Sequence, residues 1–248
     1  MKNLMIYPAI PNAGMPNWKM LSSIPIEECH EKIVPSSLSS LFKTHPVYYK
    51  MKVAHSLPEC FVRSSVMDRL NKAASTLPDG IDLVLLDGWR PYPVQQYLFE
   101  TLTNLLQKAT PKQTVEETLE KARTIVSPPT DNPSNPSPHL TGGSVDVTLC
   151  TRDGKLLDMG TEFDEASDDS WTAALEQKEN FLYSNQRDNR RMLYYAMTKA
   201  GFTNLPSEWW HYDFGNQLWA LFTNNKKALY GATSTTSIEQ MWKSQLTL

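Results

Sequence analysis

The sequence predicts an α+β protein that forms one domain over residues 1–248, with a central, mainly antiparallel sheet flanked by helices. Helix-like and strand-like segments follow one another without the regular spacing of βαβ units, and no internal repeat is present. A length of 248 residues with 40% hydrophobic residues is enough for one substantial packed core. We therefore expect a single folded body.

The first regular elements are expected after residue 60. Residues 64–77 carry apolar side chains at three- and four-residue intervals behind a serine, which predicts an amphipathic helix. The run IDLVLLDGWRP at 81–91 is rich in branched apolar residues and predicts a buried strand that stops at Asp87. Arg90 is then expected at a strand end. Further helices are predicted over 93–109 and 111–125.

The segment GSVDVTLC at 143–150 alternates polar and apolar side chains, which predicts a strand with Asp146 on its polar face. The first 60 residues are rich in proline and serine, so we expect them to be irregular and draped over the core. The motifs described below lie between about 83 and 220. The remaining elements are predicted as a helix over 187–202, a strand with aromatic faces over 207–215 and a final helix over 216–229.

Composition argues against several classes of function. The formal net charge is -3, and lysine and arginine are scattered, so we expect no nucleic-acid partner. No apolar run approaches the length of a membrane-spanning helix, and prolines interrupt the N-terminus before a signal-peptide core can form. The expected location is the cytoplasm, or the periplasm if a signal peptide has been removed. The oligomeric state cannot be read from these features.

Two of the five histidines have neighbours that indicate a site. His139 precedes a Gly-Gly pair, where a tight turn can expose a side chain, and Asp146 follows seven residues later. His211 follows Glu208 by three residues in EWWH. Residues three apart on a regular strand point to opposite faces. Glu208 and His211 can therefore share a site only if Glu208 lies on the turn after Pro206 or if a bulge intervenes.

Together, His139, Asp146 and His211 would offer two imidazole nitrogens and one carboxylate oxygen, a ligand set typical of catalytic zinc with a fourth position open for water. The ion would lower the pKa of that water to about 7, and the unligated Glu208 could pass its proton to a leaving amine. A non-haem iron site is disfavoured because its first two ligands usually lie closer in sequence. A structural metal site would normally need a fourth protein ligand, and no nearby Cys or His offers one.

Four segments in the same order resemble one family. SPHLTGGSVD is similar to the SxHxxGxAxD signature of the D-alanyl-D-alanine dipeptidases, zinc peptidases of vancomycin resistance and cell-wall dipeptide use, and EWWH matches their ExxH element. DGWRP and DMGTEFD are also similar to family segments. The sequence departs from the pattern at Ser144, where the family usually has Ala, and at Asn216, where an acid is common.

The resemblance implies the zinc-peptidase fold of the Hedgehog and D,D-peptidase type. It implies one Zn²⁺ ion per chain, bound by His139, Asp146 and His211, with Glu208 as general base and acid. We therefore expect the metal chemistry outlined above to serve peptide hydrolysis.

Three further roles follow from the resemblance. Arg90 would stabilise the transition state, which suits a guanidinium that faces the oxyanion of an attacked amide. Asp164, the last residue of DMGTEFD, would receive the free ammonium of a dipeptide. Ser137 would hydrogen-bond the substrate.

The activity so implied is zinc-dependent hydrolysis of D-alanyl-D-alanine to two D-alanines. One alternative is a related zinc D,D-carboxypeptidase or L,D-endopeptidase acting on peptidoglycan peptides, for which the cleft would be less closed. Another is a zinc-stabilised binding module without turnover. Such a module would be expected to lose Glu208 or Arg90 first, because neither holds the metal, and both are present.

Overall fold

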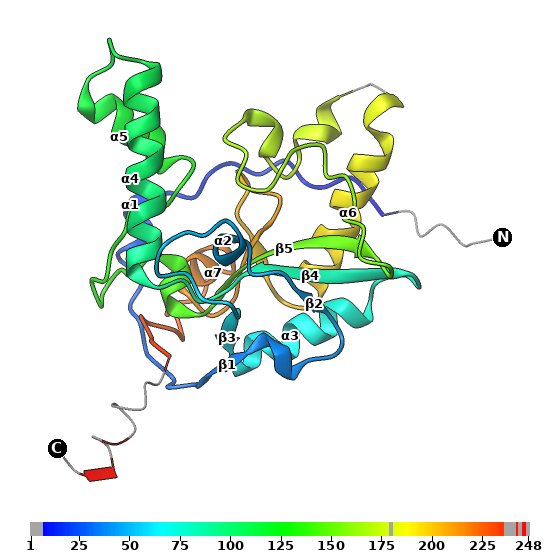
Figure 1. Ribbon diagram of the computed structural model, residues 1–248, viewed down its shortest axis with the longest axis horizontal. Coiled ribbons are helices and arrows are strands. Elements are labelled where there is room, and N and C mark those ends of the chain that lie inside the picture. Colours follow the sequence, from blue (N-terminus) through cyan, green and yellow to red (C-terminus); the bar gives the residue numbers. More distant parts are fainter. Residues whose placement is uncertain (1–6, 179–180, 236–241, 243–244, 247–248) are drawn as a thin grey trace.

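The computed structural model describes residues 7–178, 181–235, 242 and 245–246, and these form an α+β fold around a five-stranded sheet (Figure 1). In this sheet β2 pairs with β4 in parallel, and the other neighbouring strands pair antiparallel. The mainly antiparallel sheet predicted from the sequence is therefore confirmed. In spatial order the strands are β2 (Lys43–Thr44), β4 (Ile81–Asp87), β5 (Ser144–Thr151), β7 (His211–Asp213) and β6 (Thr203–Asn204).

Helices flank this sheet, and the four longest lie where the sequence predicts them, with shifted ends. Within the described residues, no helix combines the length and the apolar character needed to cross a membrane. A separate antiparallel pair is formed by β1 (Ile33–Pro35) and β3 (Phe61–Arg63). The helices are α1 (Trp18–Leu21), α2 (Val47–Lys50), α3 (Ser64–Ser75), α4 (Tyr92–Ala109), α5 (Val115–Arg123), α6 (Ser184–Lys199) and α7 (Gln217–Phe222).

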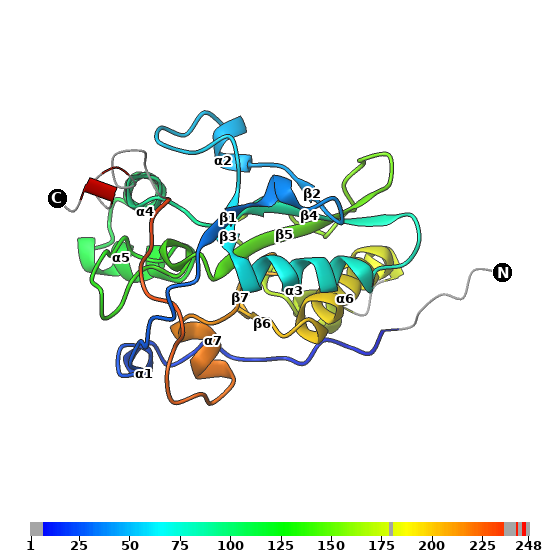
Figure 2. The same ribbon diagram turned by 90° about the horizontal axis from the view of Figure 1, so that it is seen from below.

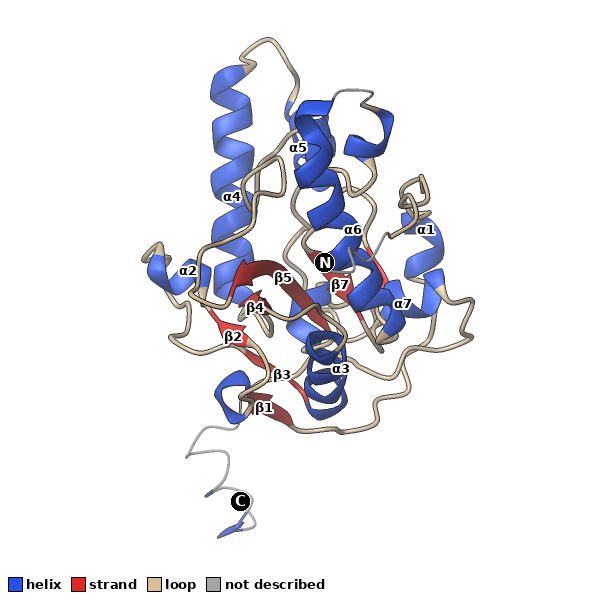
Figure 3. Ribbon diagram, turned by 90° about the vertical axis from the view of Figure 1, so that its right-hand side faces the viewer, coloured by secondary structure: helices blue, strands red, loops and turns tan. Residues whose placement is uncertain are grey.

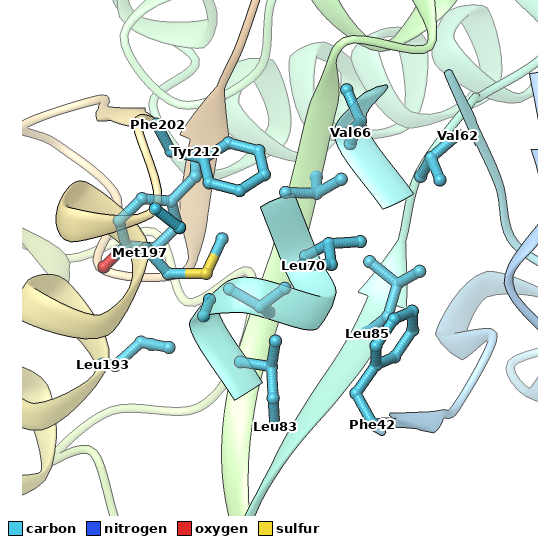
Figure 4. Close-up of a cluster of buried hydrophobic side chains, with 14 of the residues drawn as sticks. Phe42, Val62, Val66, Leu70, Leu83, Leu85, Leu193, Met197, Phe202 and Tyr212 are labelled. Atoms are coloured by element: carbon cyan, nitrogen blue, oxygen red, sulfur yellow. The ribbon is translucent and has the colours of Figure 1, made fainter. Parts of the chain in front are cut away.

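One face of the sheet carries the hydrophobic core. Helices α3 and α6 lie side by side against this face (Figure 2). Figure 4 shows Leu70 of α3 and Met197 of α6 among the strand side chains Leu83 and Leu85. Because side chains alternate along a strand, burying Val145 and its alternate neighbours in this core turns Asp146 to the opposite face.

That opposite face is the one on which polar groups gather. The helix α4 extends upward from the level of the sheet, whereas α3 lies below it (Figures 1 and 3). A capping box at Thr114 and Glu117 begins α5, which packs beside α4. The two helices therefore form a wall beside the polar face of the sheet.

Two expectations need correction. The first 60 residues do form only short elements, but β2 joins the central sheet and Phe42 is part of the core. The strand predicted over 207–215 is confined to His211–Asp213, and the final helix ends at Phe222. The chain before β7 forms tight turns instead, because the prolyl residue Pro206 suits the second position of a turn and cannot donate to a sheet ladder.

Candidate active site

Three residues bring metal-ligating atoms together on the polar face of the sheet. His139 lies in a short 3-10 helix (Pro138–Thr141), and Asp146 and His211 face each other as partners in the pairing of β5 with β7. Nε2 of His139 is 3.2 Å from Nδ1 of His211. Oδ1 of Asp146 is 3.5 Å from the first nitrogen and 3.2 Å from the second. All three side chains are buried, so the predicted ligands converge.

Two glycines make this convergence possible. Gly142 has a φ of 70°, a conformation that glycine adopts without strain, and it ends the 3-10 helix so that the chain can turn back into β5. Gly88 follows β4, and a side chain there would collide with the backbone oxygen of Phe61. The carbonyl oxygen of Gly88 lies 2.8 Å from Nδ1 of His139.

The hydrogen bonds of the two imidazoles decide which nitrogens can bind a metal. The carbonyl of Gly88 can only accept, so Nδ1 of His139 donates to it and Nε2 carries the lone pair. Nε2 of His211 likewise donates to Oδ2 of Asp213 over 3.1 Å, which leaves the lone pair on Nδ1. In the neutral rings, two lone pairs and the oxygen of Asp146 thus face one another with no proton between them.

This arrangement fits a zinc ion. Ligand atoms about 2.0–2.1 Å from a tetrahedral ion lie about 3.3–3.4 Å from one another, close to the three separations observed among His139, Asp146 and His211. Two imidazoles and one carboxylate are also a ligand set that zinc takes in catalytic sites. A cation among the three atoms would remove the repulsion between them.

Glu208 meets the condition set by the sequence, because it lies on the turn after Pro206. Its backbone N–H donates to Leu205, and its carbonyl accepts from His211. Its Oε2 is 3.8 Å from Nδ1 of His211, and the side chain is 17% exposed. Burial raises the pKa of Glu208 to about 8, with His211 opposing the rise. A bound cation would favour the ionised form that a general base needs.

Arg90 is held in place by four side chains. Its Nε donates to Asp87 over 2.7 Å, Nη1 to Gln95 over 2.8 Å, and Nη2 to Oδ2 of Asp146 over 3.1 Å. Nη2 also lies 3.3 Å from the hydroxyl of Tyr48. The guanidinium is 7% exposed and faces the cavity described below. It is therefore a fixed positive charge beside the candidate ligand Asp146, which its predicted role requires.

Asp164 lies on the same cavity, with an exposed residue surface and a φ of 61°. Its Oδ2 accepts a 2.7 Å hydrogen bond from Tyr48. Desolvation of the carboxyl group, together with the charge of Asp146, raises the pKa of Asp164 to about 6. A carboxylate that is accessible and incompletely paired can accept an ammonium group.

Ser137 has a different environment. Its hydroxyl donates to the carbonyl of Pro128 over 3.0 Å and accepts from the backbone N–H of Thr130 over 2.9 Å. The side chain is 3% exposed, and these bonds tie the proline-rich loop to the start of the 3-10 helix. Its predicted contact with substrate stays a prediction, and its visible contacts are those of a loop anchor.

Sequence reasoning missed four residues that complete the site. Asp87 begins the motif DGWRP and Asp213 lies two residues after EWWH, so each carried a signal as a carboxylate two or three residues from an assigned side chain. The remaining two had none: Gln95 is one polar residue of an amphipathic helix, and Tyr48 belongs to the segment expected to be irregular.

Comparison with known proteins agrees with this geometry. The peptidase M15 family, described as D-ala-D-ala dipeptidase, matches residues 49–228. The chain belongs to this family. The membership predicted from four motifs is therefore confirmed, and the matched region extends beyond the motifs at both ends.

Named relatives of this M15 protein are D-alanyl-D-alanine dipeptidases. That of Synechocystis sp. is 32% identical over 227 residues, which cover 82% of this chain and 90% of the relative. That of Escherichia coli is 28% identical and covers 65% of this chain and 70% of the relative. That of Enterococcus faecium is 31% identical and covers 54% and 62%.

Two solved structures are also similar. The LD-carboxypeptidase LdcB, described for its recognition of peptidoglycan, has a TM-score of 0.41 at 16% identity and covers 82% of this chain and 76% of its own. A mutant of the D,D-pentapeptidase VanY, in complex with Zn(II), has a TM-score of 0.39 at 16% identity and covers 77% and 95%.

The candidate ligands of this M15 metallopeptidase open onto a cavity of about 680 Å³. One wall is polar and carries His139, Glu208 and Asp164. The apolar wall comes from α4 and from the segment that follows α5. Cavities of this size hold drug-sized ligands, so the space exceeds what a dipeptide of two alanines fills. The lining of the apolar wall includes Leu98, Leu102, Leu105, Ile125 and Val126.

Proposed function

We propose that this protein is a zinc-dependent dipeptidase that hydrolyses D-alanyl-D-alanine to two D-alanines. The observation that carries the proposal is that the ligand atoms of His139, Asp146 and His211, the unligated carboxylate of Glu208 and the accessible carboxylate of Asp164 all face one cavity. The family acts on peptides, and its curated relatives bear this activity in their names. We assign one ion and one catalytic unit to the whole chain.

A zinc ion held by the three ligands would supply Lewis-acid activation of the scissile carbonyl and of the attacking water. Glu208 takes a proton from that water as it attacks and delivers it to the nitrogen of the leaving D-alanine. The distance of 3.8 Å between its Oε2 and Nδ1 of His211 supports this role, because the carboxylate is close to a candidate ligand without being one itself. The carbon–nitrogen bond of the peptide breaks as that nitrogen becomes an amine.

Arg90 stabilises the negative charge that develops on the carbonyl oxygen. Its side chain is already fixed by Asp87 and Gln95, so little reorganisation is needed during the reaction. Asp164 pairs with the free ammonium of the dipeptide, and Tyr48 holds that carboxylate in place. This pairing selects substrates that have a free amino group next to the scissile bond.

A second candidate function is hydrolysis of longer peptidoglycan peptides, and one observation favours it. The cavity of about 680 Å³ is roomier than the proposed substrate needs, and its apolar wall, on α4 and the segment that follows α5, can accept further groups. Asp164 argues the other way, because a peptide extended at its amino end has no ammonium to place there.

The two candidates are separated by a substrate panel. Zinc-loaded protein is incubated with D-Ala-D-Ala, with N-acetyl-D-Ala-D-Ala, and with a muramyl pentapeptide that ends in D-Ala-D-Ala, and released D-alanine is measured. The proposal predicts turnover of the free dipeptide and a loss of about 100-fold or more on acetylation, because an ammonium–carboxylate pair is removed from a partly desolvated site. Preferred turnover of the pentapeptide would instead establish the second candidate.

A further inference from the structure

A buried group of polar side chains lies behind the candidate ligand His211. Asp213 stands two residues later on β7, so its side chain is on the same face, and its Oδ2 accepts from Nε2 of His211. Its other oxygen, Oδ1, accepts from the hydroxyl of Ser144 over 2.6 Å and from Nδ2 of Asn216 over 2.6 Å. Nδ2 of Asn216 also lies 2.9 Å from the hydroxyl of Ser144. Each of these side chains is at most 4% exposed.

The backbone fixes both donors. Ser144 is the register partner of Asp213 across β5 and β7, so the two side chains stand side by side on one face. Asn216 caps α7, and its Oδ1 accepts from the backbone N–H of Trp219 over 3.0 Å. Since the amide oxygen is used there, the amide nitrogen must face Asp213. The direction of each hydrogen bond is thereby determined.

We propose that Ser144 and Asn216 are positioning residues for the metal: they saturate one oxygen of Asp213, so that its other oxygen holds the imidazole of His211 with Nδ1 aimed at the ion. Such outer partners set the orientation and tautomer of a ligand histidine. Ser144 and Asn216 are also the two positions at which this sequence departs from the family pattern. An alanine at 144 donates nothing, and an ionised acid at 216 could not donate to Asp213.

The test is zinc affinity, measured by competition with a chromophoric chelator and independently of turnover. Ser144→Ala and Asn216→Asp should each weaken binding about 10-fold, and Asp213→Asn by up to about 100-fold. The decisive variant is the double one: Ser144→Ala added to Asp213→Asn should have no further effect, because Ser144 acts only through Asp213. Thr172→Ala, which removes a buried hydroxyl bonded to Asn204, is the matched control.

Thermal unfolding of the metal-free variants separates loss of the fold from loss of the ligand geometry. Ser144→Ala introduces the residue that the family usually has, so the fold should tolerate it. Unchanged zinc affinity in Ser144→Ala and Asn216→Asp would overturn the proposal. So would a Ser144→Ala effect that persists in the Asp213→Asn background.

A separate observation concerns Ser207, the residue before Glu208. It occupies the turn from Leu205 to Glu208, lines the cavity and is 6% exposed. Its hydroxyl is buried and has no hydrogen-bond partner among the described residues. A buried hydroxyl without a hydrogen-bond partner is unfavourable. Because this hydroxyl lies on a cavity wall, we expect a bound ligand to supply the missing partner.

We infer that Ser207 donates a hydrogen bond to the carboxylate of the dipeptide, an inference that rests on the proposed function. Glu208 delivers its proton to the leaving nitrogen, and in a dipeptide a single carbon separates that nitrogen from the carboxylate. We therefore expect Ser207, the residue next to Glu208, to lie beside the carboxylate of the dipeptide. The carboxylates of Asp146 and Asp164 on this cavity repel a substrate carboxylate. The guanidinium of Arg90 also lines the cavity, but it is already bonded to Asp87, Gln95, Tyr48 and Asp146, so a further donor beside Glu208 favours binding of the carboxylate.

The test compares D-Ala-D-Ala with its C-terminal amide. Ser207→Ala should lose about 10-fold in kcat/KM on the dipeptide, mainly through KM, and clearly less on the amide, because its neutral carbonyl oxygen is a weaker acceptor than a carboxylate. Ser167→Ala is the control, because that serine is also on the cavity but its hydroxyl is bonded to Glu165. An equal loss on both substrates, or none, would overturn this inference alone. A wild-type protein inactive on both would overturn the proposed function and this inference with it.

Discussion

The hydroxyl of Tyr48 donates a 2.7 Å hydrogen bond to Asp164, although 116 positions separate the two residues in the chain. The same oxygen lies 3.3 Å from Nη2 of Arg90, from which it accepts. One phenol thus holds the proposed ammonium acceptor and the proposed oxyanion stabiliser in a fixed relation. The N-terminal third of the chain is therefore part of the site.

Removing this hydroxyl should weaken substrate binding. Tyr48→Phe keeps the ring but leaves Asp164 without its donor, so KM for D-Ala-D-Ala should rise about 10-fold while kcat changes less. Steady-state kinetics measure both constants. Tyr49→Phe, at the exposed neighbour, is the control and should behave as wild type. A Tyr48→Phe enzyme with the wild-type KM would show that Asp164 does not depend on this bond.

Dipeptide binding should weaken as the solution becomes acidic. The pKa of Asp164 is raised by partial desolvation and by the charge of Asp146, so the carboxylate takes up a proton at a higher pH than an ordinary aspartate. Only the ionised form, present above that pKa, attracts the ammonium. We therefore expect the affinity of the Glu208→Gln variant for D-Ala-D-Ala, measured by calorimetry between pH 4 and 8, to fall as the pH is lowered. The midpoint of this fall should lie above about 4, the ordinary pKa of an aspartate.

The background variant removes the titration of Glu208, so the midpoint reports on Asp164. Adding Asp164→Asn should lower affinity at neutral pH and abolish the acid-side decline. A decline of the same size in the Asp164→Asn protein would assign it to another group.

The contacts of Arg90 predict that a positive charge alone at this position is insufficient for catalysis. A lysine keeps the charge but cannot contact Asp87, Gln95 and Asp146 at once, so Arg90→Lys should lower kcat about 100-fold with zinc content unchanged. Kinetics and metal analysis on the same sample test this. The exposed Arg152→Lys serves as control. Full activity in Arg90→Lys would show that the positive charge is sufficient and that the branched shape of the guanidinium is not needed.

Zinc content should depend on His139 and not on histidines elsewhere. His139→Ala removes one of three ligands and should reduce the bound metal to a small fraction of one ion per chain after dialysis, because two ligands bind zinc poorly. His45→Ala, at an exposed position before α2, should retain it. Equal metal content in the two purified variants would place the ion elsewhere.

Strongly periodic segments could be predicted from sequence, and segments governed by tertiary contacts could not. The alternation in β5 placed Asp146 on the polar face, and the structure agrees because Val145 and its neighbours fill the core. The strand expected over 207–215 was too long, since aromatic composition alone does not reveal the turn that Pro206 begins. That turn is what brings Glu208 to the site.

The ligand set could be predicted because its residues stand in motifs that resemble one family, whereas the supporting residues could not. Tyr48 is one of ten tyrosines and lies in a proline-rich region, so nothing local separates it from the others. Asn216 differed from the family pattern without an evident reason. Its role became visible only through its contacts with Asp213 and Ser144, which depend on the pairing of β5 with β7.

The most direct test of the central claim compares wild type with Glu208→Gln for release of D-alanine from D-Ala-D-Ala, with zinc measured in both. We predict that wild type hydrolyses the dipeptide, that a chelator stops it, and that Glu208→Gln carries the same zinc but turns over at least about 1,000-fold more slowly. No hydrolysis by zinc-loaded wild type, or full activity in Glu208→Gln, would contradict the account.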